Sequence, residues 1–120
     1  MNRIFLIIAL LLAPVLTSAQ SATSANKFAF DQAAPTLADA NAYTYKYYTD
    51  GSTTANTFTG VTCTGAAPPF VCVTNIPAFT PGNHSITMTA SNIAGESAKS
   101  APFAFTFVVT PVTPANIRIQ

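Results

Sequence analysis

Strict alternation of inward and outward positions is the feature that most limits how this chain can fold. It recurs in separate segments of the 120-residue sequence, whose same-side positions are Phe28 and Phe30; Tyr43, Tyr45 and Tyr47; His84, Ile86, Met88 and Ala90; and Phe103, Phe105, Phe107 and Val109. A period of two is typical of strands with one face against a core. No stretch after residue 19 shows a sustained helical period. We therefore expect an all-β fold, a two-sheet antiparallel β-sandwich.

Turn-forming residues separate these segments and favour short connections between antiparallel strands. Asp50-Gly51 and Pro81-Gly82 supply turn chemistry, because glycine accepts positive φ without strain. Between them lie Thr53 to Cys63, which is rich in threonine and other β-favouring residues, and Phe70 to Ile76. We expect these two stretches to form the matching arms of a hairpin.

Cys63 and Cys72 are the only cysteines of the chain. Their spacing suits a disulfide between the facing strands of that hairpin, and in an oxidising compartment such a pair is expected to close. A redox or metal pair is the alternative. Zinc usually takes four ligands at tighter spacing, and His84 is the only histidine, so we predict a structural disulfide and no metal or cofactor.

The first nineteen residues have the pattern of a secretory signal peptide, expected as a helix that precedes the sandwich. Arg3 provides a positive charge, residues 4–16 are apolar, and Thr17-Ser18-Ala19 provides small residues for cleavage. A membrane anchor is the alternative, but a spanning helix needs about 20 apolar residues, and this run is shorter. We predict a secreted chain starting at Gln20, extracellular or, in a bacterium, periplasmic or on the cell surface, with no membrane span.

Residues 20–110 have the length of one domain, and residues 111–120 follow it as a tail. After position 19 the chain has four basic and four acidic residues, so the formal net charge of this part is zero. The basic residues are scattered: Lys27, Lys46, Lys99 and Arg118. Because nucleic-acid binding needs clustered lysine and arginine, we expect no nucleic-acid partner.

The tyrosine-rich strand offers a candidate contact surface. Its alternation places Tyr45 and Tyr47 on the core side and Lys46 and Tyr48 on the outward side. Tyrosine is common at binding surfaces, so Lys46 and Tyr48 are the predicted surface contact. The alternative is that they are ordinary surface, which is the more frequent case for one exposed tyrosine.

Two stretches resemble a fibronectin type III domain. From Ala90 to Ser100 the chain matches that family's Ala-x-Asn-x-x-Gly-Glu-Ser-x-x-Ser pattern position by position, after a Pro-Gly turn and an alternating strand. Tyr45 to Gly51 is similar to the family's third strand and its turn. The chain departs from the family in two places: the tryptophan usual on the second strand is missing, with Phe30 in its place, and His84 stands where a tyrosine is common.

The resemblance implies an immunoglobulin-like sandwich that acts as a non-catalytic binding or adhesion module, with an unidentified protein or glycan as its ligand. The residues themselves give no argument for catalysis. His84 alternates with buried positions and is predicted to pack as a structural residue, and no Gly-x-Ser-x-Gly motif accompanies Ser97 or Ser100. We therefore predict that the chain is not an enzyme.

The tail joins a stiff linker to a strand-like segment. Thr-Pro-Val-Thr-Pro at 110–114 favours an extended linker, and residues 115–120 resemble the opening strand of another such domain. Residues 20–26 represent the family's first strand poorly, so either they or the segment with Ile117 and Ile119 supplies it. A second hypothesis is thus a self-assembling fibre or surface subunit that donates this strand. A third is a truncated accessory domain of a larger extracellular protein.

Overall fold

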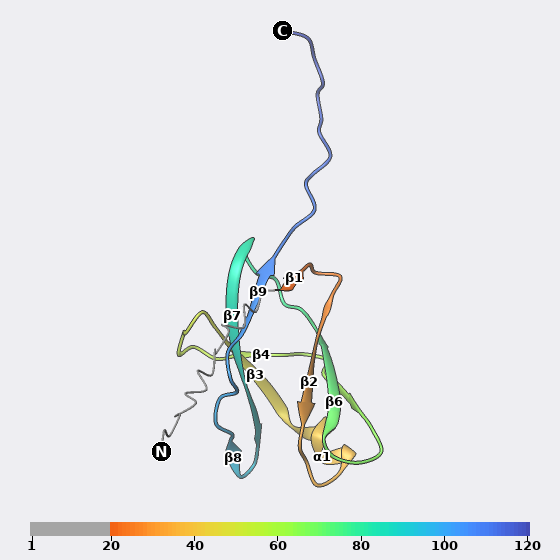
Figure 1. Ribbon diagram of the computed structural model, residues 1–120, viewed down its shortest axis with the longest axis vertical. Helices are drawn as coiled ribbons and strands as arrows, with labels where there is room; N and C mark the ends of the chain where they lie inside the picture. The colour runs from red at the N-terminus through yellow and green to blue at the C-terminus, as the bar shows by residue number, and fades with distance from the viewer. Residues whose placement is uncertain (1–19) are drawn as a thin grey trace, which may run out of the picture.

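The computed structural model describes residues 20–120, in which nine strands and one short helix form two facing sheets (Figure 1). The strands are β1 (Gln20–Ala22), β2 (Lys27–Gln32), β3 (Thr44–Thr49), β4 (Asn56–Thr57), β5 (Thr62–Thr64), β6 (Phe70–Asn75), β7 (Gly82–Asn92), β8 (Gly95–Glu96) and β9 (Phe103–Phe107), and the helix is α1 (Leu37–Ala42). The predicted signal peptide, residues 1–19, lies outside the described residues. The all-β class is confirmed.

The two sheets differ in size and in how their strands run. The larger sheet has the order β1-β9-β7-β3-β4, with β8 paired to β7, and the smaller has the order β2-β6-β5. Neighbouring strands are antiparallel except β1, which pairs with β9 in parallel. The expected sandwich is therefore present but is not purely antiparallel. The turn at residues 23–26 carries the chain across to the opposite sheet rather than back along the same one.

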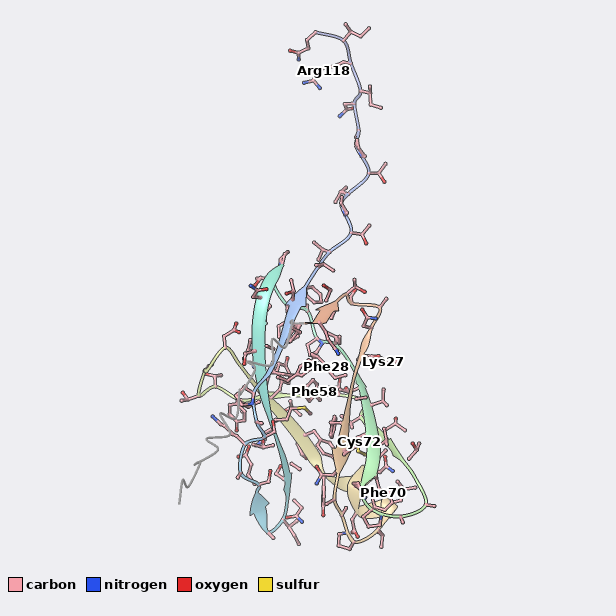
Figure 2. The ribbon with its side chains drawn as sticks, viewed as in Figure 1. Lys27, Phe28, Phe58, Phe70, Cys72 and Arg118 are labelled. Atoms are coloured by element: carbon pink, nitrogen blue, oxygen red, sulfur yellow. A yellow bond between two sulfur atoms is a disulfide. The ribbon has the colours of Figure 1, made fainter. Side chains whose placement is uncertain are left out.

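Aromatic side chains from both sheets fill the space between them, and Figure 2 shows Phe28, Phe58 and Cys72 in this interior. Phe28 of β2 meets Phe105 of β9 with ring centroids 5.4 Å apart, and Phe30 meets Tyr45 at 5.1 Å. A buried aromatic side chain removes roughly 150–250 Å² from water. The core thus links the two sheets chiefly through aromatic contacts.

Strand β9 follows the alternation that its sequence predicts, but over fewer residues than expected. Phe105 and Phe107 are buried in the core, whereas Phe103 is 43 % exposed at the start of the strand. Val109 lies beyond the end of β9 and is 57 % exposed. The expectation that Val109 extends this core strand is therefore wrong, because the sheet pairing has ended before it.

The threonine-rich stretch from residue 53 to 63 is not one arm of a hairpin. It contributes β4 to the larger sheet and β5 to the smaller one, so the chain crosses between the sheets within it (Figure 1). Phe58 is buried at the crossing, and Gly60 has a φ of +69°, which favours glycine and breaks the strand. Only the part next to Cys63 forms the expected hairpin with β6.

Helix α1 was not expected from the sequence pattern. Thr36 caps it by accepting a hydrogen bond from the amide of Asp39 at 3.2 Å. Its residue Asn41 pairs with the backbone of Cys63, accepting from its amide at 2.8 Å and donating to its carbonyl at 3.1 Å. A helix of six residues spans less than two turns, too short to show a period in the sequence.

The predicted disulfide between Cys63 and Cys72 is present. The two residues lie opposite each other in the β5–β6 register, and both are buried. The hydroxyl group of Tyr45 packs against them and donates to the carbonyl of Ala40 at 2.7 Å. Burial raises the pKa of Tyr45 to about 12, so this hydroxyl stays neutral and remains a donor.

Candidate binding site

Strand β2 presents a free edge, since within residues 20–120 it pairs with β6 on one side only. The Cα atoms of Cys63 and Cys72 are 3.9 Å apart, which marks a non-hydrogen-bonded pair between β5 and β6. The amide and carbonyl of Cys72 must then point the other way, to Phe30 of β2. Because these groups alternate along a strand, Ala29 and Asp31 direct theirs to the free edge.

A cleft of about 640 Å³ lies beside this edge, between β2 and the segment of residues 97–105. Its size is in the roughly 300–1,000 Å³ range of sites that bind small ligands or side chains. Aromatic and aliphatic side chains from both sheets form its interior, namely Phe28, Phe30, Tyr45, Ile76, Ile86, Met88, Phe103 and Phe105. The cleft therefore joins an unpaired strand edge to an apolar interior, which suits an extended segment with apolar side chains.

On the opposite wall of the cleft, serine side chains and not only strand pairing join the segment of residues 97–100 to β7. The amide of Ala90 donates to the hydroxyl of Ser97 at 3.0 Å, and the amide of Met88 donates to the hydroxyl of Ser100 at 2.9 Å. The amides of the two serines return bonds to the carbonyls of the same residues. The edge of β7 is thus satisfied there, which leaves the edge of β2 as the open side of the cleft.

The outward face of β3 differs from the expectation that Tyr48 is an exposed contact. Tyr48 is only 8 % exposed, because the ammonium group of Lys99 lies 4.0 Å from its ring centroid and its hydroxyl donates to Glu96 at 2.7 Å. Thr89 donates to the same carboxylate oxygen. Lys46 is half-buried beside this cluster. Tyr48 therefore supports the 95–100 segment, and a role of Lys46 and Tyr48 in binding stays a prediction.

Hydrogen bonds in this cluster favour the charged form of Glu96. The hydrogen bond from Thr89 is the main cause that lowers the pKa of Glu96, followed by the bond from Tyr48. The bond to Glu96 in turn raises the pKa of Tyr48. Glu96, Ser97 and Ser100 all belong to the Ala90 to Ser100 motif, so three polar residues of that motif attach this segment to the larger sheet.

His84 has a partner that its sequence neighbours did not reveal. Its Nδ1 lies 2.8 Å from the carboxylate of Asp50, and its Nε2 lies 2.6 Å from the carbonyl of Thr80. Both partners are acceptors, so both ring nitrogens donate when the ring is protonated. Asp50 is also a turn residue, with a φ of +52°. The predicted packing of His84 is present too, because its ring contacts Phe79 and Phe105.

The His84–Asp50 pair makes stability depend on pH. The hydrogen bond to Asp50, followed by the one to the carbonyl of Thr80, raises the pKa of His84 above 6.5. The protonated ring therefore contributes its full stabilisation of the fold below pH 6.5, and this stabilisation is lost as the pH rises through the pKa of His84 in the folded protein. The bond from His84 lowers the pKa of Asp50 below 3.8, so its contribution is present above pH 3.8 and is lost on acidification.

We expect Asp50→Asn to lower the melting temperature most between pH 3.8 and pH 6.5, where both wild-type groups are charged. Asparagine keeps the turn and can still accept from the amide of Ser85, so the charge interaction is what changes. Melting curves from pH 3 to pH 9 measure this, with Asp31→Asn at an exposed carboxylate as the control. A difference from wild type that is the same at every pH would contradict the assignment.

The tail extends away from the sandwich beyond β9 and forms no strand (Figure 1). Ile117 and Ile119 are 93 % and 101 % exposed. The amide of Val108 donates to the carbonyl of Ala22 at 2.9 Å, which fixes where the tail leaves. Residues 20–22 supply a first strand beside β9, but nothing among the described residues pairs with the free edge of β2. Strand donation by Ile117 and Ile119 stays a prediction.

Other kinds of site find little support in the part of the chain that the structure describes. Residues 20–120 contain no group of three or more histidine, cysteine, aspartate or glutamate side chains placed to hold a metal ion. Within the same range, no helix is long and apolar enough to cross a membrane. Comparison with known proteins found no matching family, no similar curated protein and no similar solved structure.

Sequence reasoning missed the cleft and the Asp50 partner of His84 for different reasons. The weak first strand in residues 20–26 was a usable signal for the cleft, since a strand missing from a sandwich leaves an edge unpaired. The His84–Asp50 contact joins residues 34 positions apart and left no local signal.

Proposed function

We propose that this chain is a secreted, non-catalytic binding module that captures an extended peptide segment by adding it as a strand to β2. The observation that carries the proposal is the free edge of β2, where the backbone groups of Ala29 and Asp31 stand beside the 640 Å³ apolar cleft. Backbone bonds along the edge supply affinity, and side chains entering the cleft supply selectivity. Burial of the Cys63–Cys72 disulfide suits an oxidising, extracytoplasmic location.

The type of sandwich within this proposal is that of fibronectin type III or immunoglobulin-like domains. Two features support it. The order β2-β6-β5 opposite β9-β7-β3-β4 resembles the immunoglobulin-like strand order. The Ala90 to Ser100 motif carries physical roles in the sheet, through the bonds of Glu96, Ser97 and Ser100. In such domains ligands are bound by edges, loops and faces rather than changed chemically.

Amide hydrogen exchange tests this proposal directly. We expect extended peptides with alternating apolar residues to slow the exchange of the Ala29 and Asp31 amides, which are otherwise open to water at the edge. Ala29→Pro should abolish binding without unfolding the sheet, because it removes an amide that no neighbouring strand uses. Ala29→Thr keeps that amide and is the matched control. A peptide or glycan that binds while leaving Ala29 unaffected in exchange would refute the proposed site.

A second candidate function is that of a self-assembling fibre or surface subunit. The observation in its favour is the exposed apolar side chains of the tail, Val112, Ile117 and Ile119. Single exposed apolar residues are ordinary on soluble proteins, but here two isoleucines alternate beyond a proline-containing linker. Size-exclusion chromatography of residues 20–120 and 20–110 tests this candidate, since equal monomers would rule out assembly through the tail.

A further inference from the structure

The end of the tail has the pattern of a strand whose partner is missing. Residues 115–120 read Ala-Asn-Ile-Arg-Ile-Gln, so Ile117 and Ile119 fall on one side and Arg118 on the other. Both isoleucines are almost fully exposed, and Figure 2 shows Arg118 far out on the tail. The segment carries its own amides and carbonyls without strand partners in the described chain. The backbone groups of this segment, like those at the free edge of β2, therefore have no strand partner among the described residues.

We propose that residues 115–120 of a second copy of this chain pair with the free edge of β2 and insert Ile117 and Ile119 into the cleft. This inference rests on the proposed function and names its ligand. A strand at this edge needs alternate apolar side chains facing the cleft and backbone groups facing Ala29 and Asp31. The 115–120 segment supplies both.

Charge favours the same arrangement. Residues 27–31 of β2 all border the cleft. Phe28 is buried and Phe30 half-buried, whereas the alternate positions, on the outer face of the sheet, are exposed, namely Lys27, Ala29 and Asp31. When the two isoleucines of an added strand point inward, Arg118 points outward, on the face of the sheet that carries Asp31. An arginine beside an aspartate on one face of paired strands is attracted, whereas an arginine beside Lys27, which lies on the same face, is repelled. Charge therefore selects the register that places Arg118 next to Asp31. The reverse placement would expose both isoleucines and bury Arg118 in the cleft.

The geometry favours a second copy over the chain's own tail. The bond from Val108 to Ala22 fixes the departure of the tail at the end of the sandwich where β1 lies, and Figure 1 shows the tail continuing outward from there. Pro111 and Pro114 favour an extended linker and oppose a tight reversal. The donating tail and the accepting edge are different surfaces, so the contact is head-to-tail and can repeat into linear chains.

Sedimentation of residues 20–120 across a range of concentrations is the first arm of the test. We expect concentration-dependent association, with slowed exchange of the Ala29 and Asp31 amides in the associated form. Ile117→Asp with Ile119→Asp should weaken association about 100-fold or more, because two apolar side chains no longer enter the cleft. Val112→Asp is the matched control, an exposed apolar residue in the linker, and should leave association unchanged.

Charge reversal is the second arm. Asp31→Arg alone and Arg118→Asp alone should each weaken association roughly 2- to 5-fold, as expected for one exposed ion pair. The chain that carries both changes should recover the wild-type value. Circular dichroism checks that each variant is folded, and Arg118→Asp lies outside the sandwich, so one arm does not depend on the stability of β2.

Three results would overturn the inference, and they separate it from the proposed function. A monomer at all concentrations whose Ala29 and Asp31 amides lose protection when the tail is removed would mean that the chain fills its own cleft. Association that survives the double isoleucine change would place the contact elsewhere. If other extended peptides protect Ala29 while a synthetic peptide of residues 111–120 does not, the proposed function stands and the second-copy ligand is refuted.

Discussion

We expect Phe105→Ala to lower the free energy of unfolding by about 3–5 kcal/mol, the range for a fully buried phenylalanine truncated to alanine. Phe105 is 1 % exposed and sits between the sheets. Its ring meets Phe28 of the opposite sheet at 5.4 Å and Phe79 at 5.1 Å. Truncation removes these contacts and leaves a cavity that rigid neighbouring rings cannot close. Urea denaturation followed by circular dichroism measures the loss.

Phe103→Ala is the matched control, because Phe103 lies on the same strand two positions earlier and is 43 % exposed. Its ring stacks against Phe105 with centroids 6.2 Å apart, so some packing is lost. We expect a cost of about 1–2 kcal/mol, since much of its surface is already in water. Equal losses for the two variants would mean that the core does not centre on Phe105.

Removing the disulfide should have the second largest effect. We expect Cys63→Ala with Cys72→Ala to cost about 2–3 kcal/mol, because the bridge closes a loop of nine positions in sequence and so restricts the unfolded chain. Burial of both residues adds a packing loss to this term. Denaturation of the wild type with and without a reducing agent measures the contribution of the bridge independently of the substitutions.

Reduction of the disulfide should also affect binding at the cleft. The bridge joins β5 to β6, and β6 is the only partner of β2 among residues 20–120. We therefore expect faster amide exchange first in β5 and β6 when the bridge is reduced, and weaker binding at the edge of β2 as a result. Unchanged unfolding free energy after reduction would contradict a stabilising role for the bridge. Unchanged binding would mean that β2 keeps its position without it.

Much of the fold can be predicted from the alternation of residues. The period of two in Phe28 to Phe30 and in Phe103 to Phe107 identifies strands and names the side that meets the core, because burial of one face is a local property. The cysteine spacing identifies the disulfide for the same reason, since both residues belong to one hairpin. The helix at 37–42 was not predicted, because six residues are too few to show a helical period.

The outward positions were harder to predict. Tyr48 is on the outward side of β3 as the alternation requires, yet Lys99 and Glu96 cover it. These residues lie about 50 positions away in sequence, and only the return of the 95–100 segment across the sheet brings them to Tyr48. A side chain on the outward side of a strand is therefore not always exposed in this protein. The alternation of residues along the strand could not have shown this difference.

Some features of the candidate site follow from the local alternation of residues, and others depend on contacts between distant segments. Alternation by itself determined that Ile117 and Ile119 share one side and that the apolar faces of β2 and β9 point to a common interior. Only the tertiary structure decided that β1 joins β9 rather than β2, that Asp50 reaches His84, and that the edge of β2 stays open. The physical reason is that side-chain direction repeats along a strand, whereas strand pairing is a competition between segments far apart in the chain.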